Sequence, residues 1–168
     1  MMKLRTMQAE RLRALLHYDP ETGIFTWRGK PNGRVAEGAI AGSNTKSDYR
    51  QIRIEGMYYS SNRLAVLYMT GKWPKHLVDH RNNNKRDDKW NNLRPATRSQ
   101  NNSNAVRRKD NSSGHKGVSW SKVAKKWRAR ISHEGKKIAL GHYDSLQDAA
   151  AAYAVAAFKY HGEFARLI

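Results

Sequence analysis

The sequence predicts an α+β fold made of three successive groups of elements. In residues 1–75, a helical pattern comes first, and a segment of alternating apolar and polar residues then indicates a β-hairpin. Residues 76–105 contain a strand, a polar loop, a second strand and a capped helix. Residues 114–168 contain three short strand-like segments before an alanine-rich helix, which predicts a βββα unit. Residues 106–113 are charged, then small and polar, which is typical of a linker.

The first group begins with an amphipathic helix predicted over residues 4–17. Its apolar side is formed by Leu4, Met7, Leu12, Leu15 and Leu16. The segment "DPETG" then predicts a turn, because Pro20 fixes φ and Gly23 tolerates a positive φ. "IFTW" follows as a strand, and "YRQIRI" and "MYYSS" form the hairpin around "EG". "NRLAVLYMTGK" predicts a helix that ends at Gly71.

The second group is rich in asparagine. "HLVDH" and "NNLRPA" predict two strands, and "RNNNKRDDKW" between them predicts a loop folded by bonds from side chains to the backbone. Thr97 and Gln100 form a capping box, so a helix is expected to start at Thr97. Most of the asparagines are expected to form turns rather than to bind a ligand, namely Asn82, Asn83, Asn84, Asn91 and Asn102.

The third group predicts a sheet with one apolar and one basic face. In the middle strand, the face of Trp127, Ala129 and Ile131 is apolar, and the helix after it begins with a capping box at Ser145 and Asp148. The alanines of that helix allow it to lie close to the sheet. The opposite face is expected to carry Arg128, Arg130 and Lys137, with Lys116, Trp120 and Lys122 contributed by the first strand.

The charge of the chain indicates a polyanionic partner. The formal net charge is +18 at pH 7, and residues 105–140 alone hold eleven Lys or Arg against two acidic residues. Double-stranded DNA is the expected partner, since a basic sheet face with an exposed aromatic residue suits a DNA groove. A membrane surface would require bulky apolar residues opposite lysines, whereas the C-terminal helix is alanine-rich. The remaining alternative is a solvated charged face.

Several classes of protein are excluded. The chain has no cysteine, which excludes disulfides, thiolate zinc sites and cysteine nucleophiles. The N-terminus lacks the apolar core of a signal peptide, and no run of about 18 apolar residues occurs. We therefore expect a soluble cytoplasmic protein without a membrane or small-molecule partner.

The third group resembles a known DNA-binding family. "GVSW", "KWRARI" and "GKKIALGHYDSLQDAAAAYAVAAFKYHGEFA" are similar to the APETALA/ethylene-response-factor domain, in the short form found in mobile and phage endonucleases. The resemblance implies that a three-stranded sheet lies in the major groove, with contacts from Lys116, Ser119, Arg130 and Lys137. Ser119 stands where that family usually has arginine, and Ala139 where it usually has tryptophan, so the sequence preference is expected to differ.

The second group offers the side chains that phosphodiester hydrolysis requires. A histidine, here His80, suits proton abstraction from water, and a hard divalent cation offsets charge at phosphorus and at the departing oxygen. Such a cation prefers carboxylate and amide oxygens, which Asp79 and the asparagines provide. Two strands and a helix around one cation form a ββα-metal arrangement. Adjacent residues on a regular strand point to opposite sides, so Asp79 and His80 serve together only if they flank the phosphate or if the strand end is irregular.

The motif "VDH…NKxD…NNLRxATxxQNxxN" resembles the HNH homing endonucleases of phages and their introns, as do "LLHYDPETGIFTW" and "RLAVLYMTGKWP" before it. With the third group, the resemblance covers nearly the whole chain. It implies that Asp79 and Asn101 bind the metal, that His80 is the general base and that Asn92 braces the site. Asn101 replaces the last histidine of the motif. The chain also has Asn62 where related sequences often have histidine, which would reduce activity if that histidine helps to bind DNA or the active-site loop.

The sequence therefore predicts a DNA endonuclease that uses Mg²⁺, with Mn²⁺ as an alternative, in the cytoplasm of the host cell if it is encoded by a phage. It would act as a monomer or a dimer on DNA. Further arginines are expected to position phosphates, namely Arg81, Arg94, Arg98, Arg107 and Arg108. Two alternatives are a non-catalytic DNA-binding protein with a decayed nuclease core and an RNA-binding protein associated with the ribosome.

Overall fold

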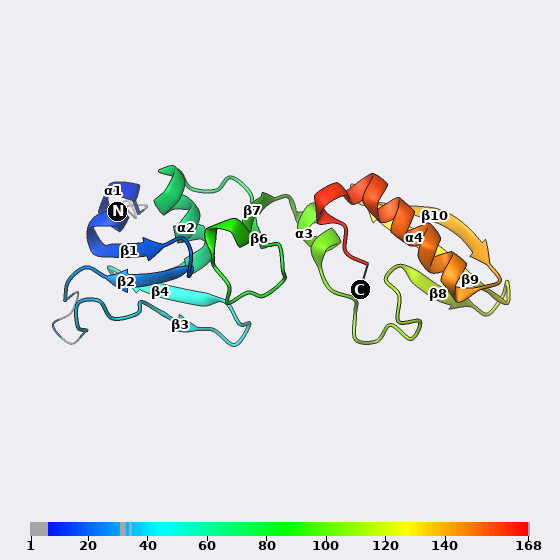
Figure 1. Cartoon of the computed structure of the whole chain (residues 1–168), viewed down its shortest axis with the longest axis horizontal. Helices are drawn as coiled ribbons and strands as arrows, with labels where there is room; N and C mark the ends of the chain where they lie inside the picture. Colours follow the sequence, from blue (N-terminus) through cyan, green and yellow to red (C-terminus); the bar gives the residue numbers. More distant parts are fainter. Residues whose placement is uncertain (1–6, 31–32, 34, 168) are drawn as a thin grey trace, which may run out of the picture. The chain divides into compact units, whose positions relative to one another are not determined.

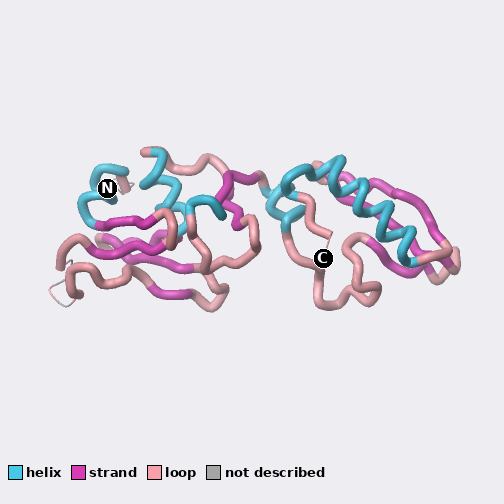
Figure 2. The backbone as a smooth tube through the Cα atoms, viewed as in Figure 1, coloured by secondary structure: helices cyan, strands magenta, loops and turns pink. Residues whose placement is uncertain are grey.

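The computed structural model describes residues 7–30, 33 and 35–167 (Figure 1). Its contacts divide the chain into two compact units, Met1–Pro95 and Ala96–Ile168. Both units combine short helices with small sheets (Figure 2), so the predicted α+β class is confirmed. The division falls inside the segment 76–105 that the sequence sets apart, so the two strands of that segment and its helix belong to different units.

The first unit contains three small sheets, in which β1 pairs with β2, β4 lies between β3 and β5, and β6 pairs with β7. Its elements are α1 (Ala9–Leu15), β1 (Leu16–Asp19), β2 (Ile24–Trp27), β3 (Ser43–Asn44), β4 (Arg50–Ile54), β5 (Met57–Ser60), α2 (Ser61–Thr70), β6 (Leu77–His80), the 3-10 helix η1 (Trp90–Asn92) and β7 (Leu93–Ala96). The predicted hairpin is confirmed as β4 and β5, and the predicted end of α2 at Gly71 is confirmed by its left-handed φ of 74°.

The first helix is shorter than the sequence predicts. It ends at Leu15, and β1 begins at Leu16. The burial of Leu16 and Tyr18 alternates with the exposure of His17, which is the period of a strand, because β1 pairs with β2 along its whole length. Leu4, assigned to the apolar side of the helix, lies outside the described residues.

One core holds the elements of the first unit together. Its fully buried members come from α1, β1, β2, β4 and α2 and include Ala41 between β2 and β3, and Val78 of β6 and Leu93 of β7 join them. The turn between β1 and β2 packs against the loop that follows β6. Gly23 has a φ of +73°, and a Cβ atom there would lie 2.3 Å from the carbonyl carbon of Asp88. The turn therefore requires glycine both for its backbone conformation and for this close approach.

The second unit contains the predicted three-stranded sheet and helix. Its elements are α3 (Arg98–Asn104), β8 (Val118–Ser121), β9 (Lys126–His133), β10 (Lys136–Tyr143), α4 (Leu146–His161) and the 3-10 helix η2 (Gly162–Phe164). Strand β9 lies between β10 and β8. Ser145 caps α4 by accepting from the backbone of Gln147 and Asp148, and Ala129, Ile131 and the alanines of α4 form the core. No helix among the described residues has the length and hydropathy needed to span a membrane.

The register of β8 corrects one prediction about the sheet. Val118 pairs with Ala129, and Trp120 pairs with Trp127, so Trp120 lies on the face that packs against α4. The burial of Val118 in the core fixes this orientation, since side chains alternate along a strand. The face of Arg128 instead receives Ser119 from β8. The prediction that Trp120 shares a face with the arginines is therefore wrong.

We expect Gly23→Ala to destabilise the first unit more than Gly56→Ala does. Both glycines have a positive φ, which costs alanine about 1–2 kcal/mol. Only at Gly23 would the new Cβ meet backbone atoms, whereas nothing lies within 4 Å of the corresponding position at Gly56. Overpacking of this kind adds about 1–3 kcal/mol. The free energy of unfolding in urea measures the difference, and equal losses in the two variants would contradict the proposed contact.

Candidate active site and nucleic-acid interface

Strand β6 carries Asp79 and His80, whose side chains are only 5% and 4% exposed. The two neighbours have different partners. Arg94 of β7 donates from Nε to Oδ2 of Asp79 at 2.8 Å. Nε2 of His80 lies 2.8 Å from Oδ1 of Asp88, in the loop that follows β6. Adjacent side chains of one strand are thus held by two separate polar contacts.

The contact with Asp88 orients the imidazole of His80. Asp88 is 3% exposed, and its carboxylate is an acceptor, so Nε2 is the nitrogen that donates the hydrogen. In this tautomer Nδ1 is the basic nitrogen of the ring. The ring of Tyr49 lies next to that of His80, with 6.0 Å between the centroids. A buried histidine held in one tautomer by a carboxylate is suited to accept a proton.

Asp88 is itself anchored by the N-terminal hairpin. The hydroxyl of Tyr18 in β1 donates to the backbone carbonyl of Asp88 at 2.6 Å. Burial, with the charge of Asp88 as the next cause, raises the pKa of Tyr18 well above its usual value. Tyr18 therefore stays protonated at neutral pH and keeps its hydrogen for this bond. Burial, followed by Asp79 and Asp88, also raises the pKa of Tyr49.

Asn92 connects the two ends of the loop. Its Oδ1 accepts from the backbone nitrogen of Asn82 at 3.0 Å, and its Nδ2 donates to Oδ1 of Asn82 and to the carbonyl of Asp87. Asn82 and Asn84 each accept a bond from the backbone two residues further on, and Asn83 has a positive φ of 61°. The turn-forming role predicted for these three asparagines is confirmed, and Asn92 makes the contacts of a bracing residue.

Helix α3 begins as predicted. Thr97 Oγ1 accepts from the backbone of Gln100, and the side chain of Gln100 accepts from the backbone of Thr97. Asn101 lies on this helix, in the second unit. Its pairing with Asp79 around a metal therefore stays a prediction.

Asp79 offers one oxygen donor of the kind that a hard cation prefers. Mg²⁺ is usually held by one or two carboxylates together with phosphate oxygens and water, and Asp79 supplies a carboxylate at the end of β6. Oδ2 of Asp79 is engaged by Arg94, so a cation would share this carboxylate with a guanidinium. In the described part of the chain, no three His, Cys, Asp or Glu side chains cluster as metal ligands.

Asn62 has a structural contact at the start of α2. It is 6% exposed, and its Nδ2 donates to the carbonyl of Val78 at 3.3 Å. Its Oδ1 accepts from the backbone of Arg63. Asn62 therefore ties α2 to β6, one residue before Asp79.

Two predicted phosphate contacts of the first unit differ in exposure. Arg81 is exposed directly after β6, as a phosphate contact would be. Arg94 is buried, at 4% exposure, and donates to Asp79. The prediction that Arg94 contacts phosphate is therefore corrected, because its guanidinium neutralises a buried carboxylate.

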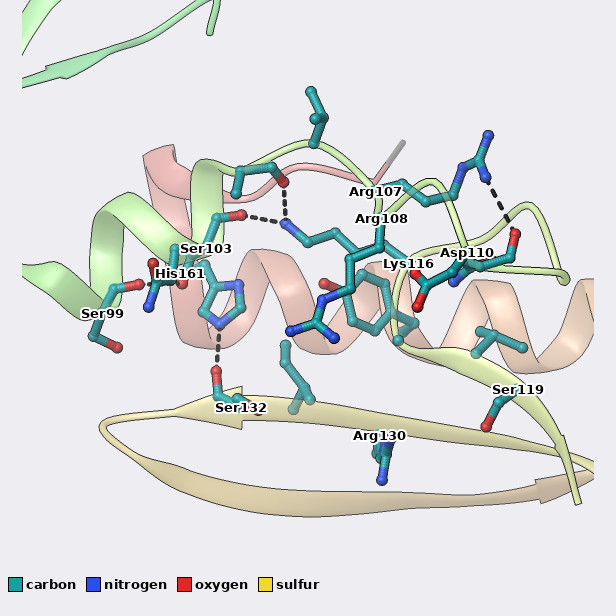
Figure 3. Close-up of a pocket in the computed structure, with 18 of the residues that line it drawn as sticks. Ser99, Ser103, Arg107, Arg108, Asp110, Lys116, Ser119, Arg130, Ser132 and His161 are labelled. Atoms are coloured by element: carbon teal, nitrogen blue, oxygen red, sulfur yellow. Dashed lines mark hydrogen bonds between the residues drawn. The ribbon is translucent and has the colours of Figure 1, made fainter. Parts of the chain in front are cut away.

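The second unit presents most of the other basic side chains that the sequence selects. Arg130 and Lys137 are exposed on the open face of the sheet, and Arg128 is partly exposed there beside Ser119. Lys122 is exposed in the turn after β8. A hollow of about 890 Å³ lies between α3, the segment that follows it, and β9 (Figure 3). Its lining includes Arg98, Arg107, Arg108, Lys116 and Arg130.

Lys116 has an internal role instead of the predicted one. Its Nζ donates to the carbonyls of Ser103 and Ala105 at 2.6 and 2.7 Å (Figure 3). Burial, together with the charge of Arg166, lowers the pKa of Lys116 to about 8. Cations often satisfy the last carbonyls of a helix in this way. Lys116 thus fixes the C-terminal end of α3 to the segment before β8.

Asp88, Tyr18 and Tyr49 are the site residues that sequence reasoning missed. Asp88 stands beside the "NKxD" motif, but nothing local shows which of two adjacent aspartates reaches His80. Tyr18 lies 70 residues before Asp88, so no periodic pattern relates them.

Comparisons with known proteins show what parts of this chain are similar to. A family model described as HNH endonuclease matches residues 61–103, which include α2, β6, the loop, β7 and most of α3. Protein 3.8 of Escherichia phage T7 is 38% identical over 97 residues, which is 57% of this chain and 79% of that protein. The HNH homing endonuclease I-HmuI, whose structure was solved in a study of its DNA binding and cleavage, is 19% identical. That match covers 87% of this chain and 84% of I-HmuI, with a TM-score of 0.43.

We expect Asn92→Asp to destabilise the loop and Asn91→Asp to leave it unchanged. A carboxylate at position 92 would lose two donated bonds and face the acceptors of Asn82 and Asp87. Groups left unsatisfied in this way cost about 1–3 kcal/mol. Asn91 is exposed in the same 3-10 helix, where substitutions change stability by about 0.5 kcal/mol or less. Urea unfolding of the two variants provides the comparison, and similar losses would refute a specific role for Asn92.

Proposed function

The chain belongs to the HNH endonuclease family, and from this premise we propose that it is a metal-dependent DNA endonuclease of the homing type. One observation carries the proposal. The imidazole of His80 is buried, is held by Asp88 through Nε2, and follows Asp79 directly on β6. This places a basic nitrogen next to a carboxylate that suits a hard cation.

In the proposed reaction, His80 removes a proton from the attacking water through Nδ1. Asp88 keeps the ring in the required tautomer and stabilises the imidazolium that results. Asn92 maintains the loop that positions Asp88. Preorganised donors and acceptors of this kind lower the barrier because they need no rearrangement during the reaction.

Asp79 and Asn101 are the proposed ligands of Mg²⁺, for which Mn²⁺ could substitute. When bound, the cation would offset negative charge on the phosphate and on the departing 3′-oxygen. The proposed partner is double-stranded DNA, whose backbone would be positioned by Arg81 and by the basic side chains of the second unit.

A second candidate function is DNA binding by a decayed nuclease. The ion pair between Asp79 and Arg94 favours it, because the guanidinium competes with a cation for the same carboxylate. Asn62, in place of the expected histidine, is consistent with it. This candidate predicts salt-dependent binding without cleavage.

Plasmid nicking with Mg²⁺ tests the proposal. We expect His80→Ala to slow nicking by about 10²- to 10⁴-fold, the usual contribution of a general base. His76→Ala is the matched control, since His76 is exposed four residues earlier. Wild-type protein that binds DNA but never cuts it, including DNA from its own genomic context, would refute the endonuclease and leave the second candidate.

The role of Asp88 is tested by two variants in the same assay. Asp88→Asn retains an oxygen that accepts from Nε2 of His80, whereas Asp88→Leu does not. We expect Asp88→Leu to lower the nicking rate by about 10- to 100-fold more than Asp88→Asn, as is typical when the outer partner of a functional histidine is lost. Unchanged DNA affinity in both variants serves as the control for folding. Equal rates in the two variants would show that Asp88 does not orient the ring.

A further inference from the structure

The hollow of the second unit is strongly basic. Five basic residues contribute to its lining, namely Arg98, Arg107, Arg108, Lys116 and Arg130, and Asp110 is the one acidic residue among them. Within the described residues, no carboxylate lies within salt-bridge distance of Arg98, Arg108 or Arg130. Several arginines without acidic partners around one concave space form a site for an anion.

We infer that this hollow binds the sugar-phosphate backbone of one strand of a DNA duplex. The inference rests on the proposed function and extends it to a surface outside the open face of the sheet. Continuity supports it, because Ser119 and Arg130 of the lining belong to β8 and β9, the strands whose open face carries the side chains of Arg128 and Arg130. In Figure 3, Arg108 lies on the loop that borders the hollow, and the side chain of Arg130 extends from β9 toward the other side of the sheet.

The dimensions favour one strand. A volume of about 890 Å³ is far too small for a whole duplex but admits a stretch of backbone. The aromatic side chains of the lining are Tyr153, which is buried, and His161, whose Nε2 bonds to the carbonyl of Ser132. Single-stranded nucleic acids usually bind through exposed rings on which bases stack. Contacts here are therefore to phosphates and carry no base preference.

Lys116 shapes the hollow instead of contacting the strand. Its ammonium bonds to two carbonyls at the end of α3, and its position between α3 and β8 keeps these elements at a fixed separation. Arg98, Arg107 and Arg108 lie on exposed positions of α3 and of the segment after it. Roles are thus divided between one partly buried cation, Lys116, which holds the walls, and exposed guanidiniums that meet phosphates.

Fluorescence anisotropy with the full chain and a labelled duplex, in EDTA to prevent cleavage, tests this division. Affinity is measured over about 50–200 mM salt, where each lost phosphate contact lowers the slope of log K against log salt by about 0.9. We expect Arg98→Gln, Arg107→Gln and Arg108→Gln each to show this decrease and a severalfold weaker affinity on unrelated duplex sequences. Lys159→Gln, an exposed cation of α4 outside the hollow, is the matched control and should keep the wild-type slope.

Lys116→Met distinguishes the two kinds of cation. We expect it to keep the wild-type slope and to lower the melting temperature, because it removes the bonds to α3 without removing a phosphate contact.

Wild-type slopes in all three arginine variants would overturn the inference and leave the endonuclease proposal intact. An equal decrease in Lys159→Gln would also overturn it, since the effect would then be one of net charge. Tighter binding of single-stranded DNA or RNA than of duplex would also overturn the inference, because the hollow would then bind a single-stranded nucleic acid. Wild-type protein that binds no duplex at low salt would overturn the DNA-binding part of the proposed function as well.

Discussion

The candidate site depends on the contact between the β1–β2 turn and the loop that follows β6. The loop has no regular structure between Arg81 and Lys89, and ordering each of its residues costs about 1–2 kcal/mol of conformational entropy. Three contacts with the turn offset this cost: the hydroxyl of Tyr18 bonds to Asp88, the amide of Trp90 bonds to Pro20, and Gly23 allows the backbones to approach. Asp88, the partner of His80, is thereby held in place by Tyr18, which lies 70 residues earlier in the sequence.

Amides suit this loop better than carboxylates would. Asn92 accepts one bond and donates two, which an aspartate cannot do without protonation. Asp79 and Asp88 are already buried nearby, and a DNA phosphate would bring further negative charge. Neutral side chains that both donate and accept satisfy the turn without adding to that charge. An asparagine at position 92 therefore suits the electrostatics of the site.

Features set by neighbours in sequence were predictable, and those set by distant partners were not. The N-caps at Thr97 and Ser145 depend on residues two or three positions apart; Thr97 and Gln100 form the predicted capping box, and Ser145 accepts from the backbone of Gln147 and Asp148. The sheet face of Trp120 depends instead on Val118 entering a core built mostly from β9 and α4. Arg94 and Lys116 are basic residues on a basic chain, and only the fold shows that one neutralises Asp79 and the other caps α3.

The ion pair of Asp79 and Arg94 has a consequence for the proposed chemistry. A buried carboxylate without a partner is costly, so Arg94 stabilises the first unit when no cation is present. A carboxylate offers about four lone-pair directions, so one carboxylate can serve a guanidinium and a cation together. A cation that shares Asp79 nevertheless adds positive charge beside a guanidinium, which opposes its binding. A DNA phosphate at the site would offset this repulsion. Cation and DNA are therefore expected to bind more tightly together than separately, and the coupling follows from one buried arginine.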